Sequence, residues 1–221
     1  MPANYPMTRG NRKKRRGRRT SKRTKSQKDM KKQLDELTQQ MDANKCCVDL
    51  QINNNVSASW SNISNLFGTG QGDDYGSRQG LNILAKTISI RGLIKKADTT
   101  NRVRLVVVMF ESSDDNSIEN VMQYNINDTS YPNAPLNSPY KINGDCKYKV
   151  LADKEYVVDA THAFAKVRMK INIPTDRQVM KYTTTGTSIP RTNQISVLAV
   201  SDSAVSTHPQ VLLNVRQRFL A

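Results

Sequence analysis

The 221-residue chain has few of the residues from which most active sites and disulfide frameworks are built. It has two histidines, and its three cysteines, Cys46, Cys47 and Cys146, show neither CxxC spacing nor a nearby histidine. The sequence therefore predicts free thiols rather than disulfides or a zinc site. The GxSxG, HExxH and Walker motifs are absent as well, so we expect no enzymatic activity and no cofactor.

Long apolar runs are also missing. No apolar stretch approaches the roughly 20 residues that a membrane-spanning helix needs. The basic N-terminus, MPANYPMTRGNRKKRRGRR, is not followed by the apolar core of a secretory signal. We therefore expect a soluble protein without a membrane partner.

Acidic residues are absent from the first 25 positions, which hold eleven of the 34 lysines and arginines of the chain. Residues 46–221 have 19 basic and 15 acidic residues, so this region contributes only +4 to the formal net charge of +15. A segment with so much like charge and so little apolar surface does not fold alone. We therefore expect a disordered basic arm at residues 1–26.

The predicted partner of this arm is nucleic acid. Cationic side chains that neutralise phosphates release counterions, which gives strong, salt-dependent binding without sequence preference. The arm offers no aromatic ring for base stacking between Arg9 and Lys25. Its KKRRGRR run would also serve as a nuclear localisation signal, a role compatible with the first. The predicted nucleic-acid-binding residues, three of them in the next segment, are Arg9, Arg12, Lys13, Lys14, Arg15, Arg16, Arg18, Arg19, Lys22, Arg23, Lys25, Lys28, Lys31 and Lys32.

A short amphipathic helix is predicted at residues 27–44. Ser26 and Asp29 fit a capping box at its start. Its apolar residues at helical spacing are Met30, Leu34, Leu37 and Met41. Because this stripe is narrow, we expect the helix to pack on other helices, copies of itself included. The alternative is a single helix packed on its own domain.

From Cys46 onward the apolar residues alternate with polar ones, which predicts β-strands. The eight candidate strands are residues 46–52, 81–94, 102–110, 147–158, 164–173, 179–183, 194–200 and 210–220. Without helical crossovers, this pattern favours an antiparallel sandwich or barrel over βαβ units, in one domain at residues 45–221. The loops 53–80, 111–146 and 174–193 are expected at the outer surface and at contacts, with one short helix near 117–123.

The glycine-rich run GTGQGDDYGSRQG, residues 68–80, is not a nucleotide loop. It lacks the GxGxxG spacing, a strand follows it in place of a helix, and Asp73 and Asp74 would repel a pyrophosphate. These aspartates, or the pair Asp114–Asp115, could help to hold a structural Ca²⁺ ion. Neither pair has the DxDxDG rhythm of a dedicated calcium loop, so we assign no metal ligands.

Two further groups of cations lie in predicted strands. Lys166, Arg168 and Lys170 share one face of residues 164–173, and Arg216 and Arg218 stand near the C-terminus. They would add to a nucleic-acid-binding surface. The alternative, which we favour from the sequence alone, is a solvated sheet face.

Several segments resemble, in order along the chain, those of a family of small viral coat proteins. The family includes the coat of satellite tobacco necrosis virus and the coats of small circular single-stranded DNA viruses. The matching segments are Gln71–Gly72, Arg78–Gly80, Ile90–Arg91–Gly92, RVRLVVVMF at 102–110, YKVLAD at 148–153 and NQISVLAVSD at 193–202. The basic arm also stands where the family has one, whereas residues 111–146 have no clear counterpart.

The resemblance implies an eight-stranded antiparallel jelly-roll sandwich, with sixty copies in a T=1 icosahedral shell whose arms point inward to a single-stranded genome. It also implies that the N-terminal helices bundle about the threefold axes. We therefore expect a self-assembling viral capsid protein, located in the virion and assembled in the host cell, in the nucleus if the arm acts as an import signal. The alternative is a host nucleic-acid-binding protein with a basic tail on a β-sandwich domain.

Overall fold

The structure is a computed structural model that describes residues 30, 32–33, 45–124, 134–142, 147–203 and 207–221. The chain divides into two units, Met1–Asn44 and Lys45–Ala221. The predicted arm and helix belong to the first unit and lie outside the described residues, except for Met30, Lys32 and Gln33, whose backbone is helical. Both therefore stay predictions. In the described part of the chain, no helix has the length and hydropathy to cross a membrane.

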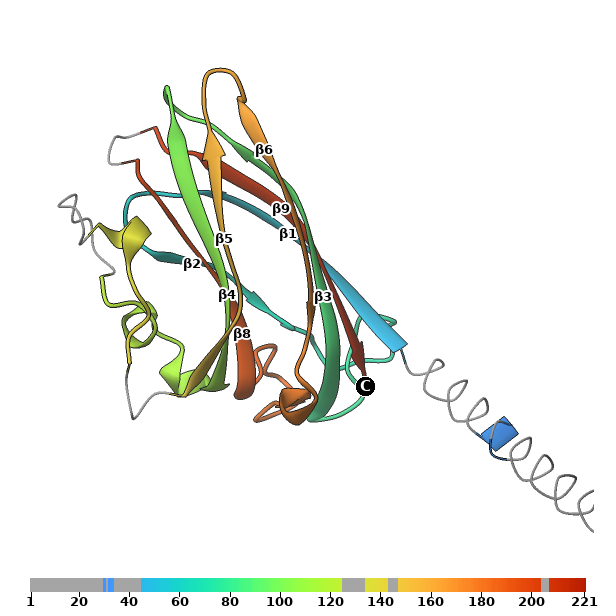
Figure 1. The fold of residues 1–221 in the computed structure, drawn as a ribbon. Coiled ribbons are helices and arrows are strands. Elements are labelled where there is room, and N and C mark those ends of the chain that lie inside the picture. The colour runs from blue at the N-terminus through green and yellow to red at the C-terminus, as the bar shows by residue number, and fades with distance from the viewer. Residues whose placement is uncertain (1–29, 31, 34–44, 125–133, 143–146, 204–206) are drawn as a thin grey trace, which may run out of the picture. The chain divides into compact units, whose positions relative to one another are not determined.

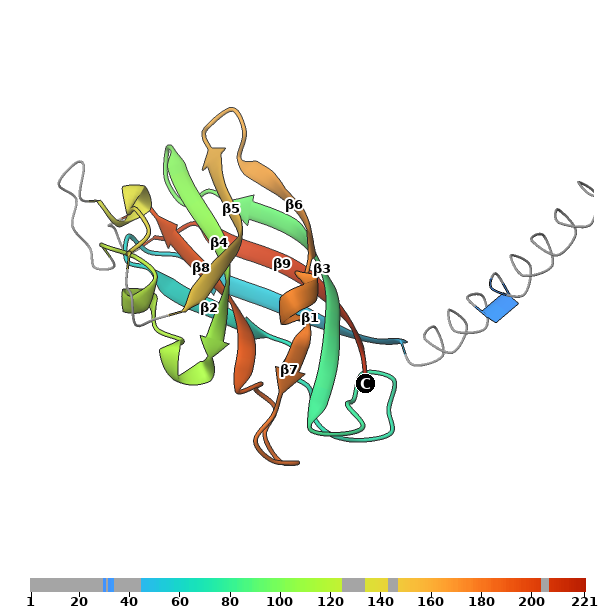
Figure 2. The same cartoon turned by 60° about the horizontal axis from the view of Figure 1, so that its bottom comes forward.

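The second unit is an all-β sandwich of two antiparallel sheets, seen as two layers in Figure 1. Sheet A has, in spatial order, β1 (Lys45–Asn55), β9 (Gln210–Leu220), β3 (Asn82–Lys95) and β6 (Phe164–Asn172). The short β7 (Val179–Lys181) pairs with the start of β3 (Figure 2). Sheet B has, in spatial order, β2 (Ser61–Leu66), β8 (Thr192–Ser201), β4 (Asn101–Ser112) and β5 (Tyr148–Val158). The predicted antiparallel sandwich is confirmed.

The main core lies between the two sheets and follows from alternation along the strands. In β6, Val167, Met169 and Ile171 are buried, while Arg168 and Lys170 between them are exposed. The inward side chains of β3, β4, β8 and β9 complete the same cluster. Because side chains alternate between the two faces of a strand, the buried apolar residues also fix which residues point outward.

A second, smaller core covers the outer face of sheet B. Residues 113–124 and 134–142, which include 3₁₀ turns at Ser113–Asp115, Ile118–Asn120 and Pro135–Asn137, lie over this face. The buried members of this core are Trp60, Val106, Val108, Phe110, Val121, Met122, Leu136, Leu198 and Val200. The helix predicted near 117–123 is only the short turn at Ile118–Asn120, and much of the predicted surface loop is a packed layer.

Two strands differ from the sequence prediction. β2 lies within residues 53–80, which we predicted as a loop, and its sequence SNISNL has only two apolar residues. The predicted strand 179–183 is reduced to the three-residue β7, which stands off the main order of sheet A. The described residues therefore form nine strands: the eight predicted ones, with 179–183 shortened to β7, and β2, which was not predicted.

The glycine-rich run 68–80 connects β2 to β3 and is closed by Arg78, which is completely buried. Its guanidinium donates hydrogen bonds to the carbonyl oxygens of Gly80 and Thr69, the latter at 3.3 Å. It also donates to the carbonyl oxygens of Thr184 at 3.0 Å and Thr187 at 2.9 Å. The run is therefore tied to the loop after β7 by an arginine rather than shaped around a phosphate.

The close approach of two strands explains why the segment Ile90–Arg91–Gly92 ends in glycine. A Cβ atom at this position would lie 2.0 Å from the carbonyl oxygen of Leu212 on β9. Any side chain would therefore separate β3 from β9, so glycine is required where these strands approach closely. The neighbouring Arg91 points the opposite way, out of the sandwich.

Candidate nucleic-acid interface

The outer face of sheet A is strongly cationic. Lysines and arginines point outward from three adjacent strands, β9, β3 and β6. We call these residues, together with one aspartate on the neighbouring strand β1, the cationic face. Its members are Arg91, Lys95, Lys166, Arg168, Lys170, Arg216, Arg218 and, on β1, Asp49. Seven cations and one carboxylate share this face, although the domain as a whole is close to neutral.

The strand register places two of these cations directly against each other. Arg91 on β3 is opposite Arg168 on β6, and Ser89 lies between Lys170 on one side and Arg216 on the other. Directly opposed residues have Cβ atoms about 5 Å apart, and like charges at that spacing destabilise a sheet. Among the described residues, the side chains of Arg91 and Arg168 form no ion pair that would offset this repulsion. A bound polyanion would remove it.

Asp49 neutralises only one member of the face. Arg216 Nη2 lies 2.6 Å from Asp49 Oδ2, and the two side chains are 54% and 58% exposed. The hydrogen bond from Arg216 lowers the pKa of Asp49, and the same bond, followed by the charge of Asp49, raises the pKa of Arg216. An ion pair this exposed contributes little to stability and yields readily to a competing anion.

Part of the cationic face is hollowed. A cavity of about 580 Å³ lies over β1, β9 and β3, and its lining includes Asp49, Arg91, Arg216 and Arg218. Along β6, the outward residues Lys166, Arg168 and Lys170 follow one another every second position, about 6.6 Å apart. A row of charges beside a shallow channel can follow a flexible, charged backbone without reading its sequence.

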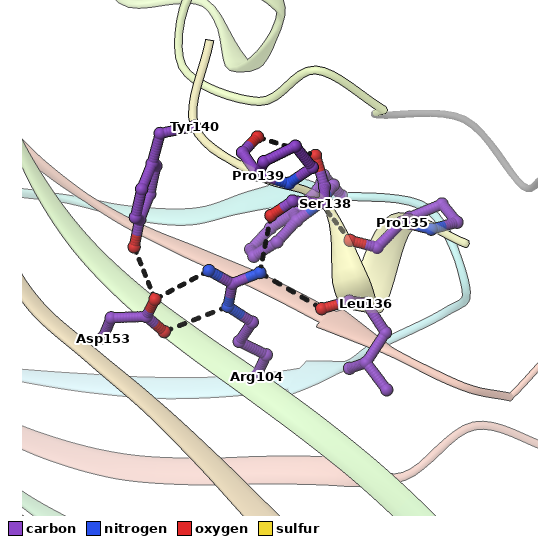
Figure 3. A network of polar contacts seen from close by, with 8 residues as sticks. Arg104, Pro135, Leu136, Ser138, Pro139, Tyr140 and Asp153 are labelled. Carbon is purple, nitrogen blue, oxygen red and sulfur yellow. Dashed lines mark hydrogen bonds and ion pairs between the residues drawn. The ribbon is translucent and has the colours of Figure 1, made fainter. Parts of the chain in front are cut away.

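The outer face of sheet B is different, because its central arginine is already bound (Figure 3). Arg104 donates two hydrogen bonds to the carboxylate of Asp153, at 3.0 and 2.7 Å, and two to the carbonyl oxygens of Leu136 and Ser138, at 3.1 and 2.8 Å. The hydroxyl of Tyr140 donates to Asp153 Oδ2 at 2.5 Å. The guanidinium also lies over the rings of Trp60 and Tyr140. This charge is therefore used to hold the covering segment in place.

The pKa values in this cluster follow from its partial burial. Burial disfavours ionisation of Asp153, but the hydrogen bonds from Arg104 and Tyr140 outweigh it and lower the pKa of Asp153. Burial, reinforced by the charge of Asp153, raises the pKa of Tyr140 well above its usual value. The Arg104–Asp153 pair is thus charged at neutral pH and anchors the segment that covers sheet B. The charge of Arg104 is therefore not available to a polyanion.

The structure brings together cations that the sequence left in separate groups. Lys166, Arg168 and Lys170 share one surface with Arg216 and Arg218, because β3 pairs with both β6 and β9. Of the residues predicted in the basic arm and helix, only Lys32 is described, and it is exposed. We had not identified Arg91 as a site residue, although its outward position follows from the alternation of residues 88–94.

Within the described ranges, the acidic pairs named above are not brought together with further metal ligands. Asp73 and Asp74 lie in the β2–β3 connection, and Asp114 and Asp115 lie in the first 3₁₀ turn after β4. Among the residues that the structure describes, no three His, Cys, Asp or Glu side chains are grouped so as to hold a metal ion. The alternative of a structural Ca²⁺ ion within one copy of the domain gains no support.

Comparison with known proteins adds no relative: no protein-family model matches the chain, and no curated protein matches its sequence significantly. The class that the fold and the surface define is an antiparallel two-sheet β-sandwich with one cationic and one covered outer face.

Proposed function

We propose that the protein is the coat protein of a small icosahedral virus, and that its sandwich is an eight-stranded jelly roll. The spatial orders β1-β9-β3-β6 and β2-β8-β4-β5 support the fold assignment. Apart from β7, each sheet alternates early and late strands of the chain, as two interleaved Greek keys require. Jelly rolls occur in capsids, lectins and cupins, so the surface must carry the functional argument.

The observation that carries the proposal is the concentration of unpaired positive charge on one of the two sheet faces. Residues 46–221 have a net charge of only +4, yet seven cations and one acid share the cationic face. In a shell, this face would look toward the genome together with the basic arm. The covered face of sheet B would not contact the genome.

The proposed mechanism of packaging is electrostatic. In a shell of sixty copies, as the resemblance implies, the fourteen predicted cations of each arm and helix would neutralise roughly 800 phosphates. A single-stranded genome also bends easily, unlike duplex DNA with its persistence length of about 50 nm. Neutralisation of the arms would allow weak contacts between domains to close the shell about symmetry axes. The virion would be the site of the protein, with assembly in the host cell, in the nucleus if the arm directs import.

The second candidate is a host nucleic-acid-binding protein with a basic tail. The cationic face fits this alternative too, so nucleic-acid binding alone does not separate the two functions. Self-assembly does, because sixty copies of the 24.9 kDa chain make a particle of roughly 1.5 MDa. Sedimentation and electron microscopy of the purified protein should show such particles, and a stable monomer with or without nucleic acid would contradict the coat-protein proposal.

Deletion of residues 1–25 tests the role of the arm. We expect particles that lack nucleic acid, or none at all, because eleven cations are removed from each copy. Nuclease typing of the extracted nucleic acid distinguishes RNA from DNA in the full-length particles. Normal packaging by the truncated protein would exclude the arm as the packaging element.

A further inference from the structure

A second hollow lies next to the cationic face and contains an exposed aromatic ring. It has a volume of about 430 Å³, and its lining includes Tyr75, Lys86, Arg216, Arg218 and Cys47. It shares Arg216 and Arg218 with the larger cavity over the middle of the face. The two hollows therefore adjoin each other at Arg216 and Arg218.

Tyr75 belongs to the connection between β2 and β3 and is held over the start of β1. Gly76, the next residue, is so close that an added Cβ would lie 3.4 Å from Val48 Cγ2 and 3.5 Å from the carbonyl oxygen of Cys47. Tyr75 itself is 70% exposed, more than any other aromatic residue among those described. The connection thus presents a ring at the rim of a cationic hollow instead of burying it in the core.

Two of the three cations in this hollow keep their charge uncompensated. Arg216 is paired with Asp49, but the side chain of Arg218 forms no ion pair within the described residues, and Lys86 Nζ donates to the neutral amide oxygen of Gln178 at 2.9 Å. Neither Asp73 nor Asp74 is among the residues that line the hollow at Tyr75, and Asp73 lines a different one, with Gln71, Gly72, Gln79 and Thr185. Phosphates are therefore attracted to the Arg218 side of Tyr75.

From this arrangement we propose that Tyr75 and its neighbouring cations form a subsite for one unpaired nucleotide of a single-stranded nucleic acid. The base stacks on the ring of Tyr75, and the adjoining phosphates are bound by Arg218 and Lys86. Aromatic rings beside a cationic groove are the arrangement by which proteins bind single strands without sequence preference. A volume near 430 Å³ is also in the range of sites for small ligands, about 300–1,000 Å³.

The position of the subsite along the chain agrees with this role. β1 begins at Lys45, and Cys46 and Cys47 line the hollow, so the basic N-terminal region is joined to the domain at this point. Nucleic acid bound by the arm would be held near Tyr75 at a high effective concentration. The subsite rests on the proposed function and makes it more specific. It would add a preference for unpaired bases to the binding of phosphates by charge.

The experiment compares two probes that differ only in their bases. Full-length protein is titrated, at about 0.5 M salt to weaken the purely electrostatic part of binding, with a fluorescent oligothymidylate and with an abasic strand of equal length. We expect the wild type to prefer the strand with bases by about 5- to 100-fold, the range of one stacked base. Tyr75→Ala should lose this preference, and Tyr75→Phe should keep it because the ring remains.

A matched control uses a second exposed aromatic ring, which lies on sheet A itself. Phe164 is 57% exposed at the start of β6, and Phe164→Ala should leave the preference unchanged. Equal binding of the two probes by the wild type, or an unchanged preference in Tyr75→Ala, would overturn the subsite while leaving packaging by charge intact. If the wild type bound neither probe at low salt, the proposed function itself would fail.

Discussion

Arg91 and Arg104 show how differently the two outer faces of the sandwich use a central arginine. Each points outward from an inner strand of its sheet, β3 in sheet A and β4 in sheet B. Arg104 is bound by Asp153 and by two carbonyl oxygens of the segment that covers it, and its side chain is only 13% exposed. Arg91 is exposed, faces Arg168, and has no carboxylate partner among the described residues. A positive charge marks a binding surface only where the protein leaves it unpaired.

The same difference extends to the apolar residues of the two faces. Sheet B has Val106, Val108 and Phe110 on its outer face, and these need a cover to exclude water. Sheet A has mainly polar and charged outward residues and needs none. The long connection after β4 therefore covers one face, and the other face remains available to a charged partner.

The largest predicted effect is on stability and comes from replacing Arg104, the arginine that Asp153 and the covering segment bind. Arg104→Met would leave Asp153 partly buried without its partner and would free two carbonyl oxygens. We expect the free energy of unfolding to fall by about 3 kcal/mol, measured by urea denaturation with circular dichroism.

The control for this variant is Arg102→Met on the same strand. Arg102 lies 2.6 Å from Glu155, but the two side chains are 43% and 40% exposed, so the loss should be below about 1 kcal/mol. Equal losses in both variants would mean that the covering segment adds nothing to the Arg104–Asp153 pair.

The next largest effect is on nucleic-acid affinity and comes from replacing unpaired cations of the cationic face. The triple variant Arg91→Gln, Arg168→Gln, Lys170→Gln should bind single-stranded oligonucleotides about 50-fold more weakly at 0.15 M salt, with a salt slope smaller by about 2. The reason is that each phosphate contact contributes about 0.7 to the slope. Fluorescence anisotropy at several salt concentrations measures both quantities.

Its matched control removes the same charge from sheet B and the segment that covers it, as Arg102→Gln, Lys141→Gln, Lys149→Gln; Lys154 is left unchanged because it lines a hollow together with Arg168 and Lys170. This variant should change the slope far less, because these residues lie outside the cationic face. If both triple variants changed the slope equally, binding would depend on net charge and not on this surface.

The smallest effect concerns the repulsion between Arg91 and Arg168. Arg168→Gln should raise the free energy of unfolding by a few tenths of a kcal/mol at low salt, because like charges opposed across two strands destabilise a sheet. The gain should disappear near 0.5 M salt, where the charges are screened. Thermal unfolding at both salt concentrations tests this. Lys149→Gln, opposite the uncharged Met109, should show no such gain, and a gain that persists at high salt would exclude repulsion as its cause.

The sequence was sufficient for the strands whose residues alternate strongly. Residues 164–173 and 210–220 were correctly predicted because each has a row of apolar residues on one face, interrupted in 210–220 only by Gln217. β2 was missed because SNISNL is polar at four of its six positions. It becomes a strand by pairing with β8, whose Ile195, Val197 and Ala199 are buried. Local propensity does not contain that information.

The cationic face was only partly predictable for a related reason. Alternation indicated that Lys166, Arg168 and Lys170 lie on one face of their strand. That they share a surface with Arg216 depends on β3 lying between β6 and β9. Strand order is set by contacts between residues far apart in the chain, and the spacing of residues does not reveal it. For the same reason the connection 111–146 was expected at the surface, although Val121, Met122 and Leu136 fill a second core.

The clamp formed by Arg78 has a consequence for the behaviour of the molecule in acid. Its contacts are backbone carbonyl oxygens and the ring of Tyr182, 4.2 Å away, and none of these takes up a proton as the pH falls. The Arg104–Asp153 anchor does titrate. Because the pKa of Asp153 is lowered on folding, its contribution is complete above about pH 4 and is lost as the pH falls through the folded value. Acidification would therefore loosen the cover of sheet B first, while the loops joined by Arg78 stay closed.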